Sequence, residues 1–78
     1  PPARALVGQA REDLATAVAR GELNPAADSD DALRLLTSVV SGIGSQQMSN
    51  EPGVTYESGA YTRLLDDALQ MWVRHFTP

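Results

Sequence analysis

Few side chains in this 78-residue sequence could carry out chemistry. His75 is the only histidine and there is no cysteine, so the sequence offers no set of nitrogen or sulfur ligands for a transition metal. Asp66 and Asp67 are adjacent, and adjacent side chains on a helix diverge by about 100° and cannot share a proton or a metal ion. We therefore interpret His75 as a helix-end residue and the two aspartates as part of a solvated face.

The serine and glycine motifs of enzymes are also missing. The sequence contains no Gly-x-Ser-x-Gly segment and no base placed to activate a serine. Gly42-Ile43-Gly44 lacks the third glycine of a dinucleotide-binding loop and falls inside a predicted helix instead of following a strand. The sequence thus predicts neither an enzyme nor a protein with a cofactor.

The charged residues argue against direct binding of nucleic acid. Ten acidic residues outnumber six basic ones, for a net charge of −4. All six bases are arginines scattered along the chain, which leaves no basic stripe to bind phosphates. Arginine without lysine, together with abundant alanine, indicates a GC-rich bacterial genome. No apolar run exceeds three residues, so we expect neither a membrane span nor a signal peptide, and a cytoplasmic location.

Hydrophobic periodicity predicts one all-α domain over residues 1–78, with helices at about 3–20, 29–48 and 56–76. Gly21 is expected to end the first helix in the left-handed conformation. Asp28 or Ser29 is expected to cap the second. A domain this small buries only about 60% of the surface of its unfolded chain. With no disulfide or metal to supplement the core, oligomerisation is the expected source of further stability.

The third predicted helix carries apolar residues over about 180° of its circumference, whereas a surface helix needs a stripe of only about 100°. Two seams run along it. The first consists of Tyr61, Leu65, Leu69, Trp72 and Phe76, and the second of Ala60, Leu64, Ala68, Met71 and His75. We assign the first seam to a contact with a second copy of the chain, with Trp72 buried in that contact. The alternative is that both seams pack into one core within the chain.

The second predicted helix has a face of small residues where a solvated face normally carries long side chains. Its two glycines, Gly42 and Gly44, each cost about 1 kcal/mol of helix stability relative to alanine, and close approach of another backbone would compensate. We assign four residues of this helix to the dimer contact: Thr37, Ser41, Gly44 and Met48. The alternative is a weak helix end that frays into the following loop.

Four short motifs follow one another along nearly the whole chain. They are Gly21-Glu22-Leu23, the acidic helix start Asp28-Ser29-Asp30-Asp31-Ala32, the leucine-rich segment 35–43 with its central Gly42, and the closing segment 61–69. Their order resembles the C-terminal regulatory domain of TetR-type transcriptional repressors. The resemblance implies a three-helix antiparallel fragment whose last two helices complete a four-helix bundle with a second subunit, giving a homodimer.

The resemblance also implies a ligand and a DNA partner. A small, mostly apolar effector would bind in a pocket to whose wall we assign Leu14, Leu36 and Val40. DNA would be bound only through a helix-turn-helix segment that these residues do not contain. The chain starts with Pro1-Pro2 and no initiator methionine, as a piece of a longer protein would.

We therefore expect the dimerisation and effector-binding portion of a TetR-like bacterial transcriptional regulator. The alternative is a free-standing helical module that docks on an unrelated partner protein and binds no effector. An enzyme subunit that contributes only scaffold is a third and more distant interpretation.

Overall fold

The computed structural model describes the backbone of residues 2–78 and the side chains of residues 5–78. Within this range the chain is all-α, as predicted, and contains no strand. Its elements are α1 (Pro2–Ala19), the short 3-10 helix η1 (Pro25–Ala27), α2 (Asp30–Asn50), the 3-10 helix η2 (Thr62–Leu64) and α3 (Leu65–His75). None of the helices in this range is long and apolar enough to cross a membrane.

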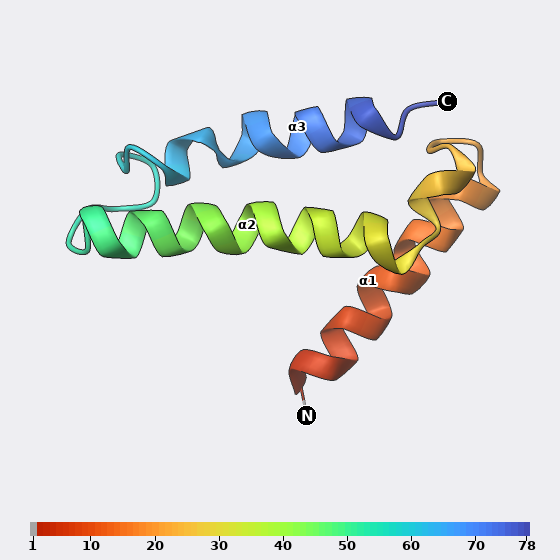
Figure 1. Ribbon diagram of the computed structural model, residues 1–78, viewed down its shortest axis with the longest axis horizontal. Helices are drawn as coiled ribbons and strands as arrows, with labels where there is room; N and C mark the ends of the chain where they lie inside the picture. The colour runs from red at the N-terminus through yellow and green to blue at the C-terminus, as the bar shows by residue number, and fades with distance from the viewer. Residues whose placement is uncertain (1) are drawn as a thin grey trace.

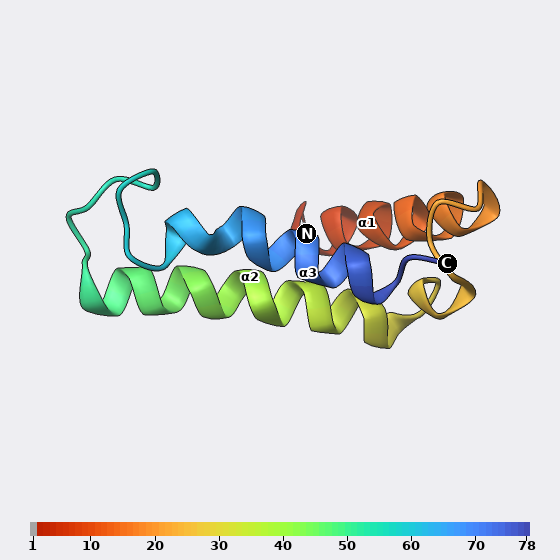
Figure 2. The ribbon, with the colours of Figure 1, turned by 90° about the horizontal axis from the view of Figure 1, so that it is seen from above.

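Helix α2 is the central element of the fold. Helix α3 runs antiparallel beside it, and α1 crosses the first part of α2 obliquely (Figure 1). Viewed from above, α1 lies to one side of the α2–α3 pair (Figure 2). The molecule measures 41 × 31 × 17 Å, with a radius of gyration of 14.1 Å. A compact chain of this length would have a radius of gyration of about 11.5 Å, so the three helices form an open arrangement.

Two predicted helix boundaries follow from local sequence signals. Gly21 adopts φ +75°, and its N–H donates to the carbonyl of Val18 at 3.0 Å while the N–H of Glu22 donates to that of Ala17 at 2.9 Å. This is the Schellman pattern that ends α1. The hydroxyl of Ser29 accepts the N–H of Ala32 at 3.0 Å and caps α2. Helix α2 then continues past both internal glycines to Asn50, so the alternative of a helix end that frays into the loop is wrong.

The predicted third helix is wrong over its first nine residues. The segment 56–64 forms turns and a 3-10 helix, and α3 begins only at Leu65. The cause is the side chain of Gln47, whose Oε1 accepts the N–H groups of Tyr61 at 3.0 Å and Thr62 at 3.1 Å. Gly59 packs so closely against Gln47 and Thr62 that a Cβ at this position would overlap both side chains. These hydrogen bonds replace those that an α-helix would make here.

The core lies where the start of α2, the end of α3 and the second half of α1 meet. Its buried members are Leu14, Ala27, Ala32, Leu33, Trp72 and Phe76, with Ala10, Val18, Leu23 and Leu36 packed against them. The N–H of Asn24 donates to the carbonyl of Phe76 at 2.7 Å and fastens the end of α3 to the loop before η1. Arg11 of α1 forms ion pairs with Asp28 and Asp30 at the start of α2. The three helices are therefore joined at one end of the molecule.

Candidate functional site

The first seam of the third helix faces inward. Trp72 is 7% exposed and Phe76 is 6% exposed, and their rings pack together with centroids 4.7 Å apart. Their own chain therefore covers most of both residues, and their predicted contact with a second subunit stays a prediction. Sequence periodicity defines an apolar arc but does not say which half of that arc faces inward. Tyr61, Leu65 and Leu69 of the same seam are half-buried, and their predicted role in a dimer contact stays a prediction.

The second seam is the one that the fold leaves uncovered. Met71 is 68% exposed and Leu64 is 46% exposed. His75 is exposed and Ala68 is half-buried. From α2, Leu35 at 47% exposure and the half-buried Val39 lie beside this seam. We name these six residues, Leu35, Val39, Leu64, Ala68, Met71 and His75, the α2/α3 face.

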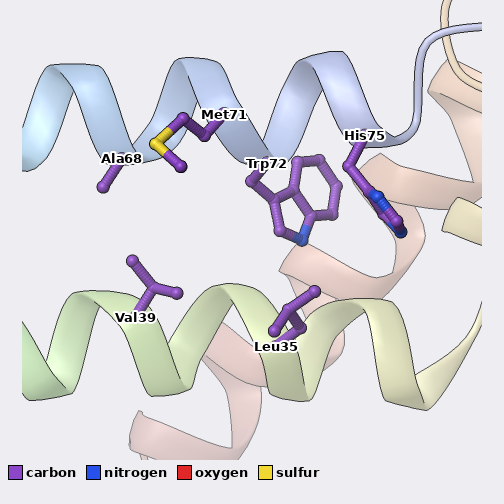
Figure 3. A pocket seen from close by; sticks show the side chains of 6 residues that line it. All are labelled: Leu35, Val39, Ala68, Met71, Trp72 and His75. Carbon is purple, nitrogen blue, oxygen red and sulfur yellow. The ribbon is translucent and has the colours of Figure 1, made fainter.

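A pocket opens in the α2/α3 face between the two helices. It has a volume of about 220 Å³ and is lined by Leu35, Val39, Ala68, Met71, Trp72 and His75. Figure 3 shows Leu35 and Val39 pointing toward α3 and Ala68, Trp72 and His75 pointing toward α2, while the side chain of Met71 runs along α3 toward Ala68. The lining residues recur every three or four positions on each helix, which places them on facing sides of the antiparallel pair.

The pocket offers apolar contact and little else. The indole N–H of Trp72 is already used, because it donates to the carbonyl of Ala32 at 3.0 Å. The ring of His75 lies edge-on to Phe76 at 4.7 Å, and His75 is the one lining residue with a titratable side chain. Among the described residues no group of His, Cys, Asp or Glu is placed to hold a metal ion. The arrangement can therefore accept an apolar side chain or molecule but supplies no acid–base pair.

The small-residue face of α2 lies elsewhere. Thr37, Ser41 and Met48 are exposed and Gly44 is half-buried, and at 100° per residue these positions fall on the side of α2 opposite Leu35 and Val39. A Cβ at Gly42 or Gly44 would meet nothing within 4 Å, so within the described residues no segment of this chain packs closely against either glycine. The assignment of this face to a dimer contact stays a prediction.

The residues assigned to an effector pocket are not gathered around one. Leu14 is a buried core residue at 8% exposure, Leu36 packs against that core, and Val40 is 40% exposed. None of the three lines the pocket of the α2/α3 face. None lines a second cavity of about 390 Å³ between α1 and α2, which is formed by Val7, Asp30, Leu33, Arg34 and Thr37. Residues that share an apolar arc can also be used in helix packing, and the assignment of these three to an effector pocket stays a prediction.

A polar cluster at the far end of α2 was not predicted. The amide nitrogen of Gln47, which is 5% exposed, donates to the carboxylate of Glu51 at 3.1 Å. The same carboxylate accepts the N–H of Ala60 at 2.7 Å. The N–H of Ala60 and the Gln47 side chain lower the pKa of Glu51 below its ordinary value. In the sequence, only Gly59 could have indicated this cluster, because a glycine lets the side chain of Gln47 approach the loop closely.

No protein-family model matches the chain, and no curated protein or solved structure is significantly similar. Inferences about function therefore rest on the exposed α2/α3 face, the two cavities and the order of the sequence motifs.

Proposed function

We propose that the chain is the dimerisation and effector-binding portion of a TetR-like bacterial transcriptional regulator, and that its α2/α3 face binds a second copy. One observation carries the proposal: the antiparallel helices α2 and α3, with the adjoining η2, present five apolar residues and His75 on one face, and four of these six side chains are exposed. Apolar faces of this kind mark contact surfaces, because left bare they promote aggregation.

The surface area of the chain supports a partner. The accessible surface is 5475 Å², whereas a compact protein of 8.3 kDa exposes about 4,600 Å². The excess of roughly 900 Å² is close to the area of about 800 Å² that each partner buries in a standard interface. A second copy is the partner best matched to this excess, since one face can then cover the other.

The effector part of the proposal rests on the cavity between α1 and α2. Its volume of about 390 Å³ lies within the usual range of about 300–1,000 Å³ for ligand pockets. Val7 and Leu33 supply apolar wall, while Asp30, Arg34 and Thr37 supply a few polar groups. This cavity involves a different side of α2 from the α2/α3 face, so an effector and a second copy could be bound together.

Two methionines provide a matched test of the contact. Met48 and Met71 are each 68% exposed and each lies on a helix, but only Met71 belongs to the α2/α3 face. Sedimentation equilibrium of the 78-residue chain should show a dimer. Met71→Glu should convert it to a monomer because two carboxylates would be buried in the contact. Met48→Glu should leave the dimer unchanged, and circular dichroism should show that both variants stay helical.

If Met48→Glu instead converts the dimer to a monomer and Met71→Glu leaves it unchanged, the contact lies on the small-residue face. A chain that stays monomeric at high micromolar concentration would reject the dimer and favour the alternative, a module that docks on an unrelated protein. A helix-turn-helix sequence in the parent gene would separate the regulator from such a free-standing module.

A further inference from the structure

The α2/α3 face combines a hollow with a protrusion, and the combination indicates how a second copy is seated. We infer that Met71 of each copy enters the pocket of the other, so that the two Met71 side chains pass one another beside a two-fold axis. This inference rests on the proposed function, because it requires that the α2/α3 face bind a second copy.

Symmetry supplies the first argument. In a two-fold contact the same surface is used twice, so any group that protrudes from it must find its hollow on that same surface. The pocket of about 220 Å³ and the side chain of Met71 at its edge are such a pair. A face with only a protrusion or only a hollow would need a partner of different shape.

Exposure and position single out Met71 as the side chain that protrudes. It is 68% exposed, against 46% for Leu64 and 47% for Leu35. Along the chain it lies between Leu64 of η2 and His75 at the end of α3, near the middle of the face. One turn away, the methyl side chain of Ala68 lets another helix approach closely. A residue near the middle of a two-fold face meets its own counterpart, which places the axis beside Met71.

The pocket suits a methionine in size and chemistry. An apolar cavity of about 150 Å³ holds a benzene molecule, so a cavity of about 220 Å³ has room for an unbranched thioether chain. Methionine adapts to irregular apolar gaps, and its sulfur contacts aromatic rings favourably. Trp72 supplies such a ring in the pocket lining, while Leu35 and Val39 supply apolar wall.

Cysteine crosslinking tests the seating directly, because the chain has no cysteine of its own. Met71→Cys should be joined into a covalent dimer by mild oxidation or by a short bifunctional maleimide. Gln70→Cys is the control at the neighbouring position. Gln70 is also exposed, but it lies about 100° away around α3, so its cysteine should not be crosslinked. Met48→Cys, with the same native exposure as Met71, should also stay uncrosslinked.

A second variant tests the pocket without changing Met71. Ala68→Phe should fill the pocket from within its own chain, and should raise the dimer dissociation constant about tenfold or more while the helical circular dichroism persists. Met71→Leu, which nearly conserves volume, should dimerise almost as well as the parent chain.

The outcomes separate the two proposals. If sedimentation shows a dimer but Met71→Cys crosslinks no better than Gln70→Cys, the reciprocal seating is wrong and the proposed dimer stands. If Ala68→Phe dimerises as tightly as the parent chain, the seating is likewise wrong. If the parent chain is a monomer, both proposals fall.

Discussion

The indole Nε1 of Trp72 donates a hydrogen bond to the backbone carbonyl of Ala32 across a distance of 3.0 Å. The two residues are 40 positions apart, near the end of α3 and the start of α2. Both are buried. This bond therefore fixes the antiparallel alignment of the two helices at the end where the core lies, and it orients the first seam of α3 inward. The second seam is exposed as a consequence.

Trp72→Ala should destabilise the chain by about 3–5 kcal/mol, as expected for removal of a large buried ring. Trp72→Phe, which keeps an aromatic contact with Phe76 but removes the N–H donor, should cost less, about 1–3 kcal/mol. Urea unfolding followed by circular dichroism measures both, at several protein concentrations so that dimer dissociation is separated from unfolding. Val73→Ala, at an exposed position of the same helix, is the control and should change stability little.

Gly59→Ala should destabilise the chain by about 1–3 kcal/mol, because the added Cβ would displace the side chains of Gln47 and Thr62. Gly53→Ala is the matched control in the same loop, where a Cβ meets nothing within 4 Å. That change should be neutral or stabilise by up to about 1 kcal/mol, since alanine restricts the unfolded chain. Equal unfolding free energies for the two variants would show that the polar cluster does not fix this loop.

Acid should weaken the polar cluster through Glu51. The pKa of this carboxyl is lowered in the folded chain, first by the N–H of Ala60 and then by the side chain of Gln47. A carboxyl with a lowered folded-state pKa stabilises the fold above its unfolded value, here 4.5, and this contribution is lost as the pH falls through the folded-state pKa. The difference in unfolding free energy between the parent chain and Glu51→Gln should therefore be constant near neutral pH and shrink below about pH 4.5. A difference that does not change with pH would contradict the role of the carboxylate.

Gly44→Ala should stabilise α2 by about 0.5–1 kcal/mol, because alanine is the better helix former and a Cβ there meets nothing within 4 Å. The variant should also keep the dimer affinity of the parent chain, since Gly44 lies on the side of α2 opposite the α2/α3 face. Thermal unfolding and sedimentation equilibrium together measure the two effects. Weaker dimerisation of Gly44→Ala would instead return the small-residue face to the contact, as the sequence alone suggested.

The sequence by itself determined the features that depend on neighbouring residues. Apolar periodicity identified three helical segments and the all-α class. Gly21 and Ser29 marked the end of α1 and the start of α2, because their capping hydrogen bonds involve residues only three to five positions away. The scarcity of histidine and the lack of cysteine likewise limited the available chemistry without reference to the fold.

Only the tertiary structure decided which apolar seam of α3 faces inward and where that helix begins. Periodicity places both seams in one apolar arc, and the first seam is held inward by the hydrogen bond from Trp72 to the carbonyl of Ala32, 40 residues away. The start of α3 is set by Gln47, whose hydrogen bonds to Tyr61 and Thr62 span 14 and 15 positions. Periodicity and helix propensity are properties of a short segment, so they carry no information about partners that the fold brings together from a distance.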